Sequence, residues 1–329
     1  MAATLIFDDM TDMIAAANEP DAWLLEGLIE EGDQVILAAA PKAGKTLMAS
    51  QIALAVASGG SFLNWRATAP RKVLYVNLEL RPKRFGRRLI TQVGGVHYLS
   101  GYRNLLAISH LRTLNILDGK QQESFSEFIR ENNIGLVVWD VLARMHNVDE
   151  NDNGTMRAVM HAIRIASADR AHLILHHMRK PSSGAENVNV GALGMRGASS
   201  IHGEADLIMA MHVRSGRGAR YSLRFSARNV EAPDEMLIER DQNLCFFEAS
   251  AHEANRLMNV IIAAFQGVQT CLAQGLLDHV MNTYCVRERR AKQLIKDAGD
   301  RGWITRRLRS DKRHEYILLT SETLFRVAA

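Results

Sequence analysis

Lys45 and Thr46 stand between a segment that predicts a buried strand, 34–40, and one that predicts a helix, 47–58. A tight turn between a strand and a helix presents backbone N–H groups to phosphate. In such a turn a lysine reaches the β- and γ-phosphates of a nucleoside triphosphate, and a hydroxyl group holds Mg²⁺. The residue types and their spacing therefore predict a loop that binds a magnesium-bound triphosphate.

The residues expected to touch the phosphates run from the strand into the helix: Ala40, Pro41, Lys42, Ala43, Gly44, Lys45, Thr46 and Leu47. Ala39 stands where such loops open with glycine, but a methyl group is tolerable there if φ is negative. A chance match within an alanine-rich helix is the alternative, and Pro41 in mid-helix would then cost about 3 kcal/mol. We therefore expect a working phosphate loop.

Two further apolar segments end in carboxylates, 71–79 at Glu79 and 134–140 at Asp140. Because the carboxyl ends of parallel strands share one edge of an open sheet, both acids are expected near Lys45. Hydrolysis of a triphosphate needs a carboxylate for Mg²⁺ and a group that activates water. We assign the Walker B metal role to Asp140, together with Thr46, and the water-activating role to Glu79. Taken alone, a strand-terminal Glu79 could equally be a solvated end.

The order of the predicted elements indicates an α/β fold. Further strands are expected at 172–177, 205–211 and 221–226, and helices at 84–92 and about 155–168. Alternating strands and helices predict a mainly parallel sheet covered on both faces. Asn153 or Asp152 is available to cap the second of these helices, and the Ser-, Gly- and Asn-rich stretch 179–194 predicts a mobile loop.

Composition narrows the class of protein. The chain has 329 residues, a formal net charge of +4 and three cysteines, Cys245, Cys271 and Cys285, which lack ligand spacing. Few cysteines suit a reducing compartment and argue against zinc. The beginning of the sequence lacks the basic and apolar regions of a signal peptide, and no apolar run approaches the roughly 18 residues of a membrane span. We expect a cytoplasmic protein without a membrane segment.

A change in composition near Ser250 predicts two domains, 1–250 and 251–329. The second contains predicted helices at 253–264, 274–283 and 287–299, followed by two strands around a charged turn. Three helices and a hairpin resemble a winged helix-turn-helix, whose third helix would face DNA while the hairpin touches the backbone. The candidate DNA contacts are Arg289, Arg290, Lys292, Lys296, Arg306 and Arg307. The alternative is a basic surface for protein contacts.

Several blocks carry a family resemblance. Asp140-Val-Leu-Ala-Arg-Met-His146 is followed by Glu150-Asn151, a predicted helix and Leu175-His176-His177, and Arg196-Gly-Ala-Ser-Ser precedes Ala205-Asp-Leu-Ile. In this order, the blocks resemble those of RepA-type plasmid-encoded hexameric replicative helicases. The span from about Trp23 to Glu248 resembles the RecA-like P-loop ATPase core of the DnaB superfamily, to which these helicases belong.

The resemblance implies roles for three more residues. His177 would occupy the sensor position, where a polar group responds to the γ-phosphate; a metal ligand or a buried strand end is the alternative for the His pair. Arg196 matches an arginine assigned as a finger in RepA-type helicases. Arg228 matches the arginine of a Lys-x-Arg finger pair, although Ser226 stands at the lysine position. A finger acting in trans contributes a factor of about 10³ or more in rate.

A site shared between subunits implies a ring, most simply a homo-hexamer. The loop 179–194, with Arg179 and Lys180, would then line a channel and hold single-stranded DNA through its phosphates, with steep salt dependence. The expected function is an ATP- and Mg²⁺-dependent ring-forming DNA helicase or translocase of a plasmid, phage or mobile element.

Two alternatives remain open. The chain could be a DNA-binding regulator or helicase loader that uses ATP as an assembly switch, and binds duplex DNA through its C-terminal domain. RepA-type helicases typically lack an obvious winged helix, which favours this alternative. A filament-forming recombination ATPase of the RecA type is the third possibility.

Overall fold

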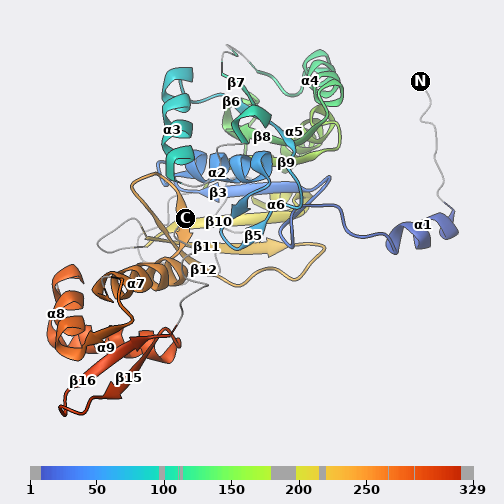
Figure 1. Cartoon of the computed structure of the whole chain (residues 1–329). Helices are drawn as coiled ribbons and strands as arrows, with labels where there is room; N and C mark the ends of the chain where they lie inside the picture. Colours follow the sequence, from blue (N-terminus) through green and yellow to red (C-terminus); the bar gives the residue numbers. More distant parts are fainter. Residues whose placement is uncertain are drawn as a thin grey trace. The chain divides into compact units, whose positions relative to one another are not determined.

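The computed structural model describes residues 9–95, 101–109, 111, 114–178, 198–214, 220–265, 267–284 and 286–319. The chain divides into two compact units, Met1–Phe247 and Glu248–Ala329 (Figure 1). The first unit contains two hydrophobic clusters, one on each face of its main sheet, and the second unit has a cluster of its own. None of the described helices combines the length and the hydropathy that crossing a bilayer requires.

A nine-stranded sheet in the order β13-β12-β11-β10-β3-β9-β8-β6-β7 forms the centre of the first unit. Its strands are β3 (Gln34–Ala39), β6 (Lys72–Asn77), β7 (Leu105–Ile108), β8 (Ile134–Asp140), β9 (Ala171–His177), β10 (Leu207–Val213), β11 (Arg220–Ala227), β12 (Met236–Arg240) and β13 (Phe246–Glu248). All neighbours from β10 to β7 pair in parallel, whereas β11 is antiparallel to both β10 and β12. This confirms the expected mainly parallel sheet.

Helices cover both faces of the sheet. They are α2 (Lys45–Ser58), α3 (Pro82–Gly95), α4 (Gly119–Glu131), α5 (Asn153–Ala166) and α6 (Ala198–Glu204). Along β3, Val35 and Leu37 join the cluster that includes α2, whereas Ile36 and Ala38 join the cluster that includes α4 and α5. A strand whose side chains are buried on both faces reads as a continuous apolar run, which is why β3 was recognisable from sequence.

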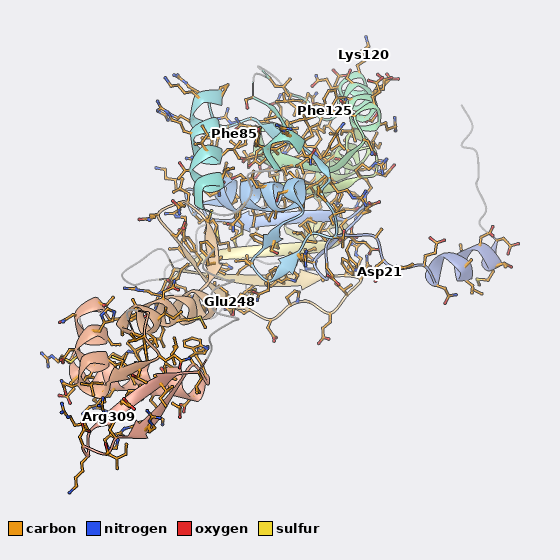
Figure 2. All side chains as sticks on the ribbon, in the orientation of Figure 1. Asp21, Phe85, Lys120, Phe125, Glu248 and Arg309 are labelled. Atoms are coloured by element: carbon orange, nitrogen blue, oxygen red, sulfur yellow. The ribbon has the colours of Figure 1, made fainter. Side chains whose placement is uncertain are left out.

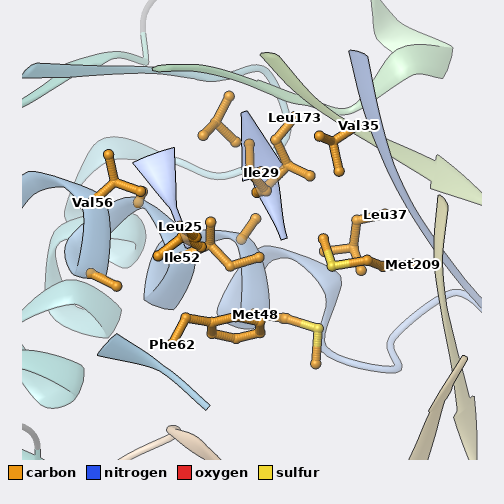
Figure 3. Close-up of a cluster of buried hydrophobic side chains, with 14 of the residues drawn as sticks. Leu25, Ile29, Val35, Leu37, Met48, Ile52, Val56, Phe62, Leu173 and Met209 are labelled. Carbon is orange, nitrogen blue, oxygen red and sulfur yellow. The ribbon is translucent and has the colours of Figure 1, made fainter. Parts of the chain in front are cut away.

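Aromatic residues show how tightly the layers pack. Phe62 packs with apolar side chains from α2, from the nine-stranded sheet and from the segment that contains Leu25 and Ile29, as Figure 3 shows. On α3, the ring of Phe85 is tilted against that of Tyr75, and their centroids lie 4.7 Å apart (Figure 2). On α4, the ring centroid of Phe125 lies 4.9 Å from that of Trp139 in the other cluster. Each helix is thus anchored to a strand that ends at the candidate site.

The described part of the first unit also contains smaller elements: α1 (Met10–Ala17), the pairs β1 (Trp23–Leu25) with β2 (Ile29–Glu30) and β4 (Ser61–Phe62) with β5 (Trp65–Arg66), and the 3-10 turns η1 (Gly101–Asn104) and η2 (Leu142–Arg144). Among the expected boundaries that differ from the structure, two bear on the candidate site. The helix begins at Lys45 rather than Leu47, because the loop turns into helical geometry directly after Gly44. The second strand ends at Asn77, so that Glu79 lies in the bend beyond it.

Within its described residues, the second unit contains three helices and a three-stranded antiparallel sheet in the order β14-β16-β15. Its elements are α7 (Ala249–Phe265), β14 (Thr270–Leu272), α8 (Ala273–Tyr284), α9 (Glu288–Asp300), β15 (Ile304–Leu308) and β16 (His314–Leu318). Sequence reasoning missed β14, because its pairing with β16 joins residues far apart in the chain and leaves no local pattern. Leu276, Leu294 and Ile304 meet in the core of this unit.

Candidate active site

The loop between β3 and α2 has the backbone geometry of an anion-binding turn. Gly44 adopts φ 108°, in the left-handed region, and a Cβ atom built there would come within 3.2 Å of the Phe246 ring. The left-handed backbone therefore favours glycine at this position, and any larger residue would also press against the Phe246 ring. Ala39, by contrast, is a buried residue of the strand, where a methyl group fits. The residues predicted to bind phosphate, 40–47, form this turn and the first turn of α2.

Lys45 is held inside the loop. Its side chain is buried, and its Nζ donates to the carbonyl oxygens of Ala39 at 3.0 Å and Ala40 at 3.2 Å. The Nδ1 atom of His177 lies 3.0 Å from the same Nζ. Because an ammonium group can only donate, Nδ1 of His177 accepts and its ring proton resides on Nε2. Burial lowers the pKa of Lys45 to about 8, although the carboxylates of Glu79 and Asp140 oppose the shift.

Asp140 lies buried at the end of β8, where the predicted metal-binding pair comes together. The hydroxyl of Thr46 hydrogen-bonds the Asp140 carboxylate, and the hydroxyl of Tyr75 donates to its Oδ2 at 2.9 Å. Burial raises the pKa of Asp140 to about 6, while the bonds from Thr46 and Tyr75 work in the opposite direction. The carboxylate of Asp140 is therefore shielded from solvent and lies next to the Thr46 hydroxyl. Both groups are oxygen ligands suited to Mg²⁺.

Glu79 is exposed and lines a cavity of about 570 Å³ at the carboxyl edge of the sheet. His177 lines the same cavity from the end of β9. The segment after β8 contributes Arg144 and His146 to the lining of this cavity. A carboxylate, an imidazole and a positively charged guanidinium thus face one space next to Lys45. This arrangement can hold and activate a water molecule beside a terminal phosphate.

The structure does not bring Arg228 to this site. Its backbone N–H donates to the carbonyl oxygen of Asp206, and its guanidinium lies 3.6 Å from the Asp206 carboxylate and hydrogen-bonds Gly203. Asp206 also accepts a bond from the backbone of Gln34, the first residue of β3. Arg228 therefore lies at the amino edge of the sheet, whereas the phosphate loop lies at the carboxyl edge. Arg179, Lys180 and Arg196 fall outside the described residues.

The predicted DNA contacts of the second unit are exposed. Arg289, Lys292 and Lys296 recur along one side of α9, and Ala291 and Ile295 are buried on the other. Arg290 is also exposed and lies in the first turn of the same helix. On the hairpin, Arg306 is exposed and Arg307 donates to the buried Glu315 at 2.6 and 3.0 Å, which fixes the direction of its guanidinium.

Sequence reasoning missed three residues at the site: Tyr75, Asn77 and Arg240. Tyr75 reads as an ordinary member of an apolar strand, and only the pairing of β6 with β8 brings its hydroxyl to Asp140. Arg240 reaches the phosphate loop from the end of β12, and its Nη1 would lie 3.4 Å from a Cβ on Gly44. No local pattern marks a contact between such distant parts of the chain.

Comparison with known proteins places this site in a family. A family model described as an AAA domain matches residues 3–183, which include the phosphate loop, Glu79, Asp140 and His177. The fold is similar to that of the KaiC-like protein PH0186 from the hyperthermophilic archaeon Pyrococcus horikoshii OT3, at 15% identity and a TM-score of 0.48. That match covers 68% of this chain and 93% of the other. No curated protein matches this sequence.

Proposed function

The chain belongs to the AAA domain family, and we propose that it is a RecA-like P-loop ATPase that hydrolyses ATP with Mg²⁺ to move on single-stranded DNA. The observation that carries the proposal is the convergence of Lys45, Thr46, Asp140 and Glu79 at one edge of the sheet. In this proposal the chain is a ring-forming helicase or translocase of a plasmid, phage or mobile element, acting as a homo-hexamer.

Each side chain has a defined part in the proposed hydrolysis. Lys45 would exchange the loop carbonyls for the phosphate oxygens, and Thr46 with Asp140 would hold Mg²⁺, which neutralises charge on the transferring phosphoryl group. Glu79 would accept a proton from the attacking water. The bond from Lys45 to His177 supports the sensor role of His177, since a γ-phosphate would compete with the imidazole for the same ammonium group.

The second unit supports a DNA-binding role, which we propose is that of a winged helix-turn-helix. Its three helices and three-stranded sheet, with exposed basic residues on α9 and on the hairpin, suit a helix placed against the phosphate backbone. This unit also favours the second candidate function, a regulator or helicase loader that binds duplex DNA and uses ATP as an assembly switch without unwinding.

The decisive measurement is the ATPase rate of the full chain with and without single-stranded DNA, together with strand displacement from a forked substrate. We expect single-stranded DNA to stimulate hydrolysis, and we expect Lys45→Ala to lower the rate at least about 100-fold because a charged phosphate contact is lost. Lys120→Ala, which removes an exposed lysine of α4 outside the phosphate loop, is the matched control. Unwinding that survives Lys45→Ala would end the helicase proposal, and tight duplex binding without any unwinding would favour the regulator.

A further inference from the structure

Hydrogen bonds from the ends of β6 and β8 hold the backbone of the two residues that flank Glu79. Before Glu79, the Leu78 N–H donates to the carbonyl oxygen of Asp140 at 2.7 Å. After Glu79, the Leu80 N–H donates to Oδ1 of Asn77 at 2.9 Å, and Nδ2 of Asn77 donates to the Leu80 carbonyl oxygen at 2.7 Å. A single side chain therefore satisfies both backbone groups of one residue and closes the bend that carries Glu79.

Asn77 is placed for this contact by the sheet. It is the last residue of β6, it pairs in register with Asp140 of β8, and only 2% of its surface is exposed. Its Nδ2 also donates to the hydroxyl of Ser109, which follows β7, at 2.9 Å. The reversed orientation of the amide would set donor against donor and acceptor against acceptor at Leu80, so the bonds assign one orientation.

The exposed Glu79 carboxylate takes its position from the backbone that carries it. That backbone is tied on one side to the residue proposed to bind Mg²⁺, Asp140, and on the other side to Asn77. Rates depend steeply on such placement, since a shift of about 1 Å at a reacting group can cost about 100-fold. Without Asn77 the bend would keep its link to Asp140 and lose both bonds to Leu80.

We infer that Asn77 is a positioning residue that sets the distance of Glu79 from the terminal phosphate. The inference rests on the proposed function, in which Glu79 activates the attacking water. Asn77 acts through the Leu80 backbone and does not touch the nucleotide, so its effect should fall on the rate of hydrolysis and not on nucleotide affinity.

The test compares three variants of the full chain. For Asn77→Ala we expect kcat for ATP hydrolysis to fall by about 10- to 100-fold, while the affinity for a non-hydrolysable ATP analogue stays within about two-fold of the parent. Ser109→Ala is the matched control, because it removes the link from Asn77 to the end of β7 but leaves both bonds to Leu80. We expect kcat of Ser109→Ala to stay within about two-fold of the parent value. Asn77→Val fills the buried position at the end of β6 but offers no polar atom to Leu80, so it should behave as Asn77→Ala does and serves as the second variant if the alanine variant folds poorly.

Amide hydrogen exchange provides a readout independent of activity. The Leu80 amide should exchange faster in both Asn77 variants and remain unchanged in Ser109→Ala, since only the former lose its acceptor. An unchanged kcat in well-folded Asn77 variants would overturn the inference, and so would equal losses in Asn77→Ala and Ser109→Ala. Glu79→Gln separates the two proposals: if that variant hydrolyses ATP at the parent rate, the proposed role of Glu79 is wrong as well.

Discussion

At the scale of single residues, the main feature of the site is that burial disfavours the ionised form of the Asp140 carboxyl group. Burial raises its pKa to about 6 although Thr46 and Tyr75 both donate hydrogen bonds to the carboxylate. Since the folded pKa lies above the ordinary value of 3.8, Asp140 favours the fold below about pH 4, and this contribution is lost as pH rises through about 6. At neutral pH the ionised form costs about 3 kcal/mol, which a bound cation would offset.

The first prediction concerns Tyr75. Tyr75→Phe removes the hydroxyl that stabilises the ionised carboxylate but keeps the ring against Phe85, so the pKa of Asp140 should rise further, by about one unit. If Asp140 binds Mg²⁺ as we propose, binding of Mg²⁺-ATP should weaken below about pH 6 in the parent and at correspondingly higher pH in the variant. Dissociation constants between pH 5.5 and 8 measure this. Tyr316→Phe, in the second unit, is the control, and identical pH profiles for parent and Tyr75→Phe would contradict the prediction.

At the scale of elements, helix termini explain where α4 and α5 begin. Asp152 caps α5 by accepting a bond from the Gly154 N–H at 2.9 Å, and Asp118 caps α4 through the Lys120 N–H at 3.0 Å. Both caps stand before helices whose apolar side is buried under the sheet. The cap of α5 was foreseen from sequence as Asn153 or Asp152. We did not predict α4 from the sequence, although Asp118 is a good N-cap residue and the spacing of Phe125 and Ile129 is typical of one face of a helix.

A second prediction follows for α5. Asp152→Ala leaves the Gly154 N–H without its side-chain acceptor and should lower the free energy of unfolding by about 1 kcal/mol. Urea denaturation of the full chain measures the loss, and nucleotide affinity should stay unchanged because Asp152 lies outside the site. Glu127→Ala, on the exposed side of α4, serves as the control and should change stability by less than about 0.5 kcal/mol. If the free energy of unfolding of Asp152→Ala equals that of the parent, the prediction is wrong, and water satisfies the Gly154 N–H as well as the Asp152 side chain does.

At the scale of the whole molecule, the position of Arg228 decides what it can do. It sits beside the first residue of β3, whereas the phosphate loop follows the last. A strand of six residues is about 20 Å long at about 3.3 Å per residue, so Arg228 cannot reach the phosphates of its own subunit. If it serves hydrolysis at all, it does so for a neighbouring copy.

Mixing two inactive variants tests this trans role. Arg228→Ala keeps a complete phosphate loop, and Lys45→Ala keeps a complete Arg228, so mixed rings would contain interfaces in which both groups are intact. We expect each variant alone to lose at least about 100-fold in ATPase rate and the mixture to regain part of it. Arg164→Ala removes another partner of Asp206, at 3.2 Å, and should keep its activity. A mixture that stays inactive, or an active Arg228→Ala, would exclude the trans finger.

The sequence by itself determined the parts of the site that depend on neighbours in the chain. The phosphate loop, the strand before it and the acid at the end of β8 are local patterns of burial, turn residues and spacing, and the alternation of elements was enough for the mainly parallel sheet. Only the tertiary structure decided that Tyr75 reaches Asp140, that Asn77 closes the bend carrying Glu79, and that Arg228 faces away from the loop of its own subunit. These depend on strand pairing and on where strands end, because hydrogen bonds between distant segments leave no periodic trace in a single chain.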